Sequence, residues 1–160
     1  MTRSNRRFTA PSSSGPRLIC CTWARTSAGP PSFELAVMET PRGTTLYNTL
    51  VDFVQERQQR EFLEIKTPLI YNKRLWEQSG HWGKYRENMF LVLDSETNEH
   101  DMSLKPMNCP SHFLYFASAR HSYRELPTRY ATLDVLHRNE LSGALSGLTR
   151  VRQFQQDDCH

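Results

Sequence analysis

The chain has 160 residues and carries 20 Lys and Arg against 17 Asp and Glu, a formal charge of +3. That length predicts one domain, or one domain with a tail. No stretch approaches the ~18 consecutive apolar residues of a membrane-spanning helix, which excludes an integral membrane protein. A hydrophobic content of 38% with 11% aromatic residues excludes a wholly disordered chain. Four cysteines without a Cys-x-x-Cys pair are typical of a reducing compartment.

The N-terminal segment differs from the rest, because its first 33 residues carry five Arg and no acidic side chain. Rich in Ser, Pro and Thr, it cannot bury enough apolar surface to fold alone, so we expect residues 1–38 to be a disordered basic tail. A transit peptide, an ordinary tail and a mis-joined leader are all compatible with this composition. A cytoplasmic location is the default and a mitochondrial one the alternative. Residues 34–160 hold 15 basic and 17 acidic side chains, so net charge does not argue for a nucleic-acid surface.

Residues 39–160 alternate between helix and strand patterns, which predicts an α+β domain with a mostly antiparallel sheet and flanking helices. After a turn at Pro41-Arg42-Gly43, apolar residues at steps of three and four predict an amphipathic helix over 45–60, capped by Thr44 or Thr45. The elements expected next are strands at 61–67, 89–93 and 100–104, a helix at 111–121, and strands at 132–140 and 150–160. The polar residues 94–98 form the turn of a hairpin.

The segment 150–160 has little apolar character for a core strand. Because side chains alternate between the two faces of a strand, its even positions lie together, and residues of the same parity on the preceding strand share that face. The residues so placed are Arg138, Glu140, Arg150, Arg152, Phe154, Gln156, Asp158 and His160. Guanidinium, aromatic and amide groups suit a polyanionic ligand that carries a base. The solvated face of an edge hairpin is an equally good interpretation.

Cys109 and His160 are the Cys/His pair that we consider as metal ligands. Their spacing lies far outside a local zinc-finger pattern, so a buried structural cysteine is the competing interpretation for Cys109. By alternation, Cys159 faces away from His160. The histidines that we interpret as helix-surface or half-buried side chains, not ligands, are His81, His112, His121 and His137.

Five strings resemble the catalytic core of the threonyl-tRNA synthetase family, which belongs to the class II aminoacyl-tRNA synthetases. The strings are Thr67-Pro68, LWEQSGHWGKYRENMF at 75–90, LKPMNCPSH at 104–112, SYRELPTR at 122–129 and HRNELSGALSGLTRVRQFQQDDCH at 137–160. The helix at 45–60 and the strand before Pro68 also match the family's first class II motif. Residues 1–38 match nothing in the family. The resemblance therefore implies a partial catalytic core over 39–160 with motifs 1 and 2 only.

An ATP site in the second motif is the first thing that the resemblance implies. Arg138 would hold the α-phosphate as the catalytic residue, and Arg150 would reach the γ-phosphate. Glu140 would contact the adenine amino group, and Phe154 would stack on the adenine ring. Mg²⁺ would accompany the ATP phosphates.

The resemblance also implies a zinc site beside a threonine pocket. In the family one zinc is bound by a Cys and two His, and Cys109 and His160 fall on the first two of these ligands. Met107, Gln156 and Asp158 would line the threonine pocket. Zinc that binds both the amino and hydroxyl groups of threonine would reject valine, which an apolar pocket separates by only ~100-fold.

The implied function is ligation of threonine to tRNA(Thr) through threonyl-adenylate, by a homodimer formed through the first motif. The third motif, the third zinc ligand and an anticodon-binding domain do not appear in the sequence, so we expect the 160-residue chain alone to be inactive. A non-catalytic dimerisation or regulatory fragment is the alternative. A sibling class II enzyme for proline or serine shares the broad motifs, but the MNCP and QDDCH strings together argue against it.

Overall fold

The computed structural model describes the backbone of residues 21–22, 38–146 and 149–160, with side chains from residue 40 onward. The tail expected at 1–38 therefore lies almost entirely outside the described residues. At the start of the described part, strands β1 (Cys21–Thr22) and β2 (Met38–Glu39) pair antiparallel. None of the described helices is long and apolar enough to cross a membrane.

Helix α1 (Pro41–Gln58) begins at Pro41 and not at residue 45. Thr40 caps it, because its hydroxyl oxygen accepts a hydrogen bond from the backbone N–H of Gly43 at 3.2 Å. Pro41 fits the first helical position, since the N–H that it lacks would have no partner inside the helix. The predicted separate turn at Pro41-Arg42-Gly43, with Thr44 or Thr45 as the cap, is therefore wrong.

A three-stranded antiparallel sheet has the order β4 (Ile70–Asn72), β6 (Met102–Leu104) and β5 (Leu91–Val92). Strands β5 and β6 confirm the predicted hairpin, and Asn98 in its turn has a φ of 57°, a left-handed conformation that Asn tolerates. The strand predicted at 61–67 is shorter, because only β3 (Leu63–Glu64) pairs, in parallel, with β7 (Tyr130–Thr132).

Each of the two C-terminal strands predicted at 132–140 and 150–160 is divided into two. Strand β7 pairs with β10 (Asp158–Cys159), and β8 (Val135–His137) pairs with β9 (Gln153–Gln155), both antiparallel. The register continues across the break, because Leu136 lies opposite Phe154 and Thr132 lies opposite Asp158. The break falls at Asp134, whose carboxylate is bound by Thr67 and Lys105 outside the ladder.

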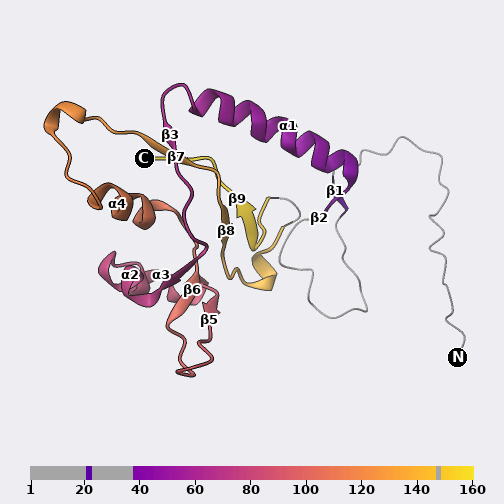
Figure 1. Ribbon diagram of the computed structural model, residues 1–160. Coiled ribbons are helices and arrows are strands. Elements are labelled where there is room, and N and C mark those ends of the chain that lie inside the picture. Colours follow the sequence, from indigo (N-terminus) through magenta and orange to yellow (C-terminus); the bar gives the residue numbers. More distant parts are fainter. Residues whose placement is uncertain (1–20, 23–37, 147–148) are drawn as a thin grey trace, which may run out of the picture.

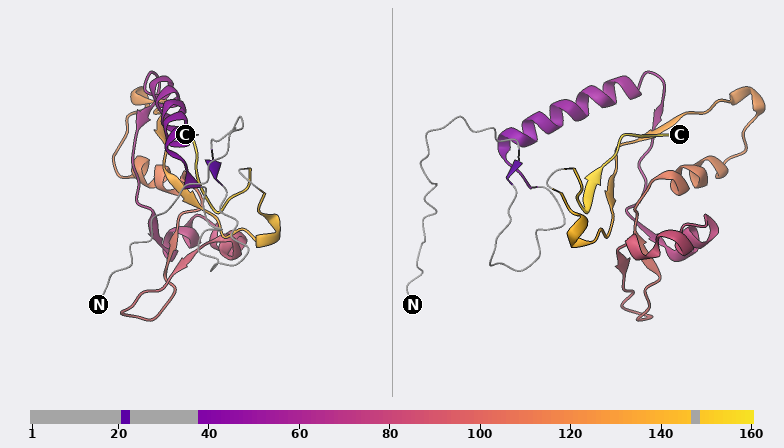
Figure 2. Two further views of the ribbon diagram at one scale, coloured as in Figure 1. Left: turned by 90° about the vertical axis from the view of Figure 1, so that its right-hand side faces the viewer. Right: turned by 180° about the vertical axis from the view of Figure 1, so that it is seen from behind.

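Helices α2 (Lys73–Gln78), α3 (Trp82–Tyr85) and α4 (Cys109–Ala117) lie to one side of the β8–β9 hairpin, and α1 runs across the top of the molecule (Figures 1 and 2). The first two were not predicted. Helix α4 ends at Ala117 and not at residue 121, because the backbone N–H and hydroxyl of Ser118 both bind the Tyr115 carbonyl. Short 3₁₀ helices cover Arg86–Asn88, Tyr123–Glu125 and Ser142–Ala144. The predicted α+β architecture with flanking helices is confirmed.

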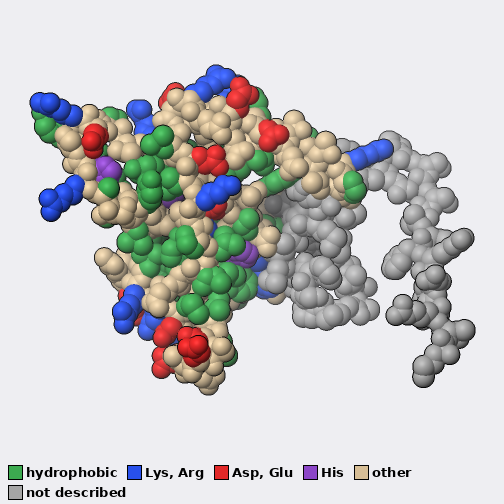
Figure 3. Space-filling model, viewed as in Figure 1, with side chains coloured by type: hydrophobic (Ala, Val, Ile, Leu, Met, Phe, Trp, Pro, Cys, Tyr) green, Lys and Arg blue, Asp and Glu red, His purple; other side chains and the backbone are tan. Residues whose placement is uncertain are grey.

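The core of the described part is small and rich in polar groups. Its buried apolar residues are Trp76, Met89, Tyr130, Ala131 and Leu136. Its buried polar residues are Ser103, Lys105, Asn108, Ser111, His112 and Thr132, most of them within 103–112. Figure 3 shows apolar side chains reaching the surface across the middle of one face, with charged ones toward the edges. Burying polar groups is unfavourable unless they are paired, so we expect the buried polar residues of segment 103–112 to have specific partners or a functional role.

Candidate functional site

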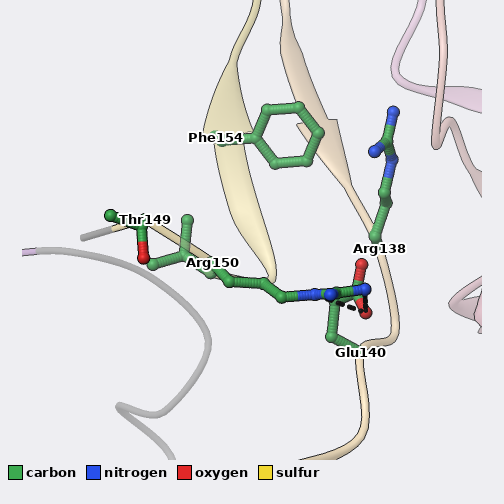
Figure 4. Close-up of a pocket in the computed structure, with 6 residues that line it drawn as sticks. Arg138, Glu140, Thr149, Arg150 and Phe154 are labelled. Carbon is green, nitrogen blue, oxygen red and sulfur yellow. Dashed lines mark hydrogen bonds and ion pairs between the residues drawn. The ribbon is translucent and has the colours of Figure 1, made fainter. Parts of the chain in front are cut away.

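A pocket lies beside the connection between β8 and β9 (Figure 4). The residues that line it are Arg138, Glu140, Thr149, Arg150, Val151 and Phe154. The continuous antiparallel register explains their meeting, since Arg138 directly follows β8 and its backbone N–H donates to the Arg152 carbonyl at 2.8 Å. All four residues expected to contact ATP are therefore gathered in one place, as the alternation of side chains predicts.

Arg138 is held against the aromatic wall of this pocket. Its guanidinium carbon lies 4.9 Å from the centre of the Phe154 ring. Its Nε donates a hydrogen bond to the carbonyl of Pro106 at 3.2 Å. These two contacts orient the guanidinium, while its terminal nitrogens make no hydrogen bond to the described residues and stay available for an anion.

Arg150 and Glu140 pair with each other across the pocket. The Nη2 and Nε atoms of Arg150 lie 2.9 and 3.2 Å from the same carboxylate oxygen of Glu140. The Arg150 side chain is 57% exposed, whereas that of Glu140 is 12% exposed. Figure 4 shows Arg150 extending below the Phe154 ring to reach the carboxylate. Because a solvent-exposed ion pair is weak, a polyanion can compete with Glu140 for this arginine.

Cys109, Asp158 and His160 form a second cluster. One ligand atom from each lies within 4.8 Å of the others, although Cys109 begins α4 while the other two come from the β10 segment. Sulfur, carboxylate oxygen and imidazole nitrogen are the donors that zinc favours, so the residues fit a zinc ion. Burial, and then the nearby Asp158, raise the pKa of the Cys109 thiol, so metal binding has to displace its proton. The predicted pair Cys109 and His160 thus meets in space, with Asp158 added to it.

His112 also belongs to this cluster, although the sequence analysis interpreted it as a surface or half-buried side chain. It is 2% exposed, and its Nδ1 lies 2.8 Å from the Nδ1 of His160. Burial, and then the facing His160, lower the pKa of His112 and favour its neutral form. The spacing Cys109-x-x-His112 is the signal that could have found it, because residues three apart share a face of a helix.

Residues 105–108 connect the pocket to the cluster. The Lys105 carbonyl accepts the backbone N–H of His137 at 3.0 Å, and Asn108 Nδ2 donates to Asp158 Oδ2 at 3.2 Å. Lys105 itself is fully buried, and its Nζ lies 2.6 Å from the Asp134 carboxylate. The sequence analysis did not single out Lys105, because nothing in the local pattern marks a lysine as buried.

Three other residues of the predicted face and pocket lie apart from these groups. Met107 is half-buried within 105–108, and Gln156 is exposed between β9 and β10. Arg152 donates to the Glu140 carbonyl at 2.8 Å and to Ser142 at 3.1 Å, and does not line the pocket. Cys159 faces α1, where Gln58 Nε2 lies 3.5 Å from its sulfur, so it points away from His160 as predicted.

Comparison with known proteins identifies the family. Residues 90–160 match the family described as the tRNA synthetase class II core domain (G, H, P, S and T). The threonine–tRNA ligase of Myxococcus xanthus is 67% identical over 122 residues, which cover 76% of this chain and 19% of that protein. The chain is homologous to threonine–tRNA ligases. It spans about a fifth of the length of the curated relatives it matches.

Two further relatives bear on the N-terminal segment and on location. The threonine–tRNA ligase of Anaeromyxobacter dehalogenans is 54% identical over 154 residues, which cover 91% of this chain and 23% of that protein. A match of that extent reaches into residues 1–38, so the expectation that this segment matches nothing in the family is wrong. The Caenorhabditis elegans relative, named cytoplasmic, is 55% identical over 121 residues, or 75% of this chain and 16% of that protein. These relatives give no support to the mitochondrial alternative.

Solved structures show the same fold. The RNA binding domain of threonyl-tRNA synthetase from Cryptosporidium parvum superposes with a TM-score of 0.73 at 50% identity, over 79% of this chain and 31% of that one. Prolyl-tRNA synthetase from Giardia lamblia, in complex with prolyl-adenylate, gives a TM-score of 0.67 at 20% identity, over 76% of this chain and 25% of that one. The second likeness concerns the fold alone. The chain therefore has a class II synthetase fold, as expected.

Proposed function

We propose that this chain contributes the ATP- and threonine-binding part of a threonine–tRNA ligase. The observation that carries the proposal is the pocket of Arg138, Glu140, Arg150 and Phe154, joined through residues 105–108 to the Cys109–Asp158–His160 cluster. In the proposed reaction the threonine carboxylate attacks the α-phosphate of ATP. The bond from that phosphorus to the pyrophosphate oxygen breaks, and threonyl-adenylate forms. The terminal adenosine of tRNA(Thr) then accepts the threonyl group.

The pocket would act by positioning ATP and neutralising its charge. Arg138, already oriented by Phe154 and Pro106, would bind the α-phosphate, where negative charge grows during the attack. Phe154 would stack on the adenine, and Glu140 would accept a hydrogen bond from its amino group. Arg150 would leave Glu140 and bind the γ-phosphate, and Mg²⁺ would accompany the phosphates. The exposure of Arg150 supports this exchange of partners.

The cluster would select the amino acid. Cys109 and His160 would hold zinc, which supplies binding to both the amino and hydroxyl groups of threonine and so discriminates against valine. Met107, Gln156 and Asp158 would line the threonine pocket. The hydrogen bond from Asn108 to Asp158 supports that role, because it fixes the orientation of the carboxylate.

A homodimer through α1 is part of the proposal. Leu46, Leu50 and Phe53 lie at helical spacing and are 46%, 57% and 53% exposed, so α1 turns an apolar stripe outward. Contiguous apolar surface of this kind is typical of an interface. The alternative, a non-catalytic dimerisation fragment, is supported by the same stripe. Sedimentation velocity distinguishes a dimer from a monomer. A wild-type chain that is monomeric, and whose sedimentation does not change in Leu50→Glu, would contradict both the homodimer and the dimerisation fragment.

The relatives support the remaining proposed partner and the proposed compartment. tRNA(Thr) is the nucleic acid that a threonine–tRNA ligase acylates, and the Caenorhabditis elegans relative is named cytoplasmic. We therefore place the protein in the cytoplasm with tRNA(Thr) as its nucleic-acid partner. Fractionation of source cells that finds the protein in an organelle would contradict this placement.

The experiment that tests the function is threonine-dependent exchange of pyrophosphate into ATP by the natural polypeptide that carries this sequence. We expect exchange with threonine and none with valine or proline, which lack the hydroxyl group. Arg138→Ala should lower the rate by about 10²–10³-fold, because it removes a group that stabilises the developing charge. Cys109→Ser should abolish exchange, whereas the matched control Cys159→Ser, on the opposite face, should leave it unchanged.

Each outcome of this assay is decisive. Exchange supported by proline or serine in place of threonine would overturn the threonine assignment. A folded polypeptide with no exchange for any amino acid would overturn the catalytic proposal in favour of the dimerisation fragment. Equal losses in Cys109→Ser and Cys159→Ser would show that the effect is not specific to the proposed metal ligand.

A further inference from the structure

One buried imidazole is left with an unexplained geometry. His112 comes from α4 and contacts His160, the last residue of the chain, with ring centres 4.6 Å apart and an interplanar angle of 87°. The two Nδ1 atoms lie 2.8 Å apart, within hydrogen-bond distance. The other ring nitrogen of His112, Nε2, is buried and has no hydrogen-bond partner among the described residues. Among the residues that the structure describes, this 2% exposed side chain therefore hydrogen-bonds to His160 alone.

The direction of this hydrogen bond decides what His160 can do. A neutral imidazole carries one proton, so one of its nitrogens donates while the other holds a free lone pair. When His160 donates through Nδ1, its Nε2 lone pair is free to bind a metal. When His112 is the donor, the proton of His160 resides on Nε2, which then cannot bind a metal. Metal-bound histidines almost always donate their second ring N–H to a protein acceptor.

We propose that His112 is a positioning residue for the metal site: it accepts the Nδ1–H hydrogen bond of His160 and so presents Nε2 of His160 to a metal ion held together with Cys109. The inference rests on the zinc site of the proposed function. Asp158 is a poorer candidate for the same task, because its Oδ1 lies 3.5 Å from His160 Nδ1, beyond ordinary hydrogen-bond length. Asn108 moreover occupies the other Asp158 oxygen at 3.2 Å.

Helix α4 explains why His112 is suited to this task. Its backbone N–H donates to the Asn108 carbonyl at 3.3 Å, which fixes the first turn of the helix that also begins with Cys109. The ligand Cys109 and the orienting His112 therefore move as one rigid unit. His160 directly follows β10 and is held beside β7, because it exchanges two backbone hydrogen bonds with Tyr130 at 2.7 and 2.9 Å. The metal site is thus assembled by docking one helix turn against one strand end.

The experiment measures zinc affinity of the natural polypeptide that carries this sequence by competition with a chromophoric chelator. His112→Phe keeps a ring but removes both nitrogens, and should weaken zinc binding by about 10–100-fold, the usual effect of losing such an outer partner. His112→Asn places an amide oxygen near the Nδ1 position and should recover most of the affinity. The matched control His100→Phe, at an exposed histidine, should bind zinc as the wild type does. With Co²⁺ in place of zinc, the thiolate-to-metal absorption band reports whether Cys109 remains a ligand.

The outcomes separate this inference from the proposed function. Wild-type affinity in a folded His112→Phe overturns the inference and leaves the zinc site in place. A folded natural polypeptide that binds no zinc overturns the zinc site, and the inference falls with it. Where circular dichroism shows that His112→Phe is unfolded, the wild-type chain loaded with ¹¹³Cd decides. Coupling of the metal to Nε2 of His160, with a proton on its Nδ1, supports the inference, and coupling to Nδ1 overturns it.

Discussion

Two ion pairs beside the β8–β9 hairpin differ in what surrounds them. Lys105 and Asp134 lie 2.6 Å apart with side-chain exposures of 0% and 16%, whereas Arg150 and Glu140 lie 2.9 Å apart with exposures of 57% and 12%. The first pair has a third partner, because Thr67 accepts a hydrogen bond from Lys105 and donates two to Asp134, from its backbone N–H and its hydroxyl. The cation of the second pair contacts its partner directly, but is itself open to solvent.

The difference assigns the two pairs different roles. Separating a buried pair leaves a desolvated charge, so the Lys105 pair holds together three segments: the end of β3, the loop before α4 and the break between β7 and β8. Separating an exposed pair changes little, so Arg150 is free to change partners. Strand β8 is therefore flanked by an anchored carboxylate, Asp134, and by Glu140, whose partner is exchangeable. The anchored pair fixes the frame in which the exchangeable pair meets its ligand.

The largest loss of stability is expected from Lys105→Met. The substitution keeps the length and apolar stem of the side chain but leaves Asp134 unpaired beside Thr67. We expect the free energy of unfolding to fall by about 3–5 kcal/mol, toward the lower end because Asp134 keeps some contact with water. Urea denaturation followed by circular dichroism measures it, with the exposed Lys84→Met as control. A loss below about 1 kcal/mol would mean that the pair is not an anchor.

Low pH should weaken the Lys105–Asp134 pair, with a smaller loss of stability than Lys105→Met causes. Burial raises the pKa of Asp134, but the hydrogen bonds from Lys105 and Thr67 outweigh it and hold the pKa below its ordinary 3.8. The unfolded chain then takes up this proton at higher pH than the folded one, so the stabilisation is complete above about pH 3.8 and is lost as the pH falls through the lower folded value. Urea denaturation at a series of pH values checks this. Equal slopes below pH 4 for wild type and Asp134→Asn would contradict it.

The sequence predicted the exchangeable region well and the anchored one poorly. Alternation placed Arg138, Glu140, Arg150 and Phe154 on one face, because the hairpin keeps a single register across its break. A period of two survives such a break as long as neither strand slips. The polar face could therefore be predicted from the local sequence alone.

The anchored region depends on contacts that local order does not contain. Lys105 meets Asp134 across 29 residues, and His112 meets His160 across 48. A lysine or histidine in a sequence is read as exposed by default, and only the partner reveals that it is buried. The break between β7 and β8 was missed for the same reason. The start of α1 differs from the prediction for a local reason. Pro41 and Gly43 are typical of a turn, but the N–H of Gly43 is the group that Thr40 caps at the start of the helix.

The smallest effect on stability is expected from removing the exposed arginine of the second ion pair. Arg150→Ala removes the exposed partner of Glu140, and we expect the free energy of unfolding to change by less than about 1 kcal/mol, because exposed pairs contribute little. Binding of a fluorescent ATP analogue should nevertheless weaken, since the proposed contact with the γ-phosphate is lost. Arg60→Ala, which removes another exposed pair far from the pocket, is the matched control and should leave nucleotide binding unchanged. A stability loss in Arg150→Ala as large as that of Lys105→Met would erase the distinction between anchored and exchangeable pairs.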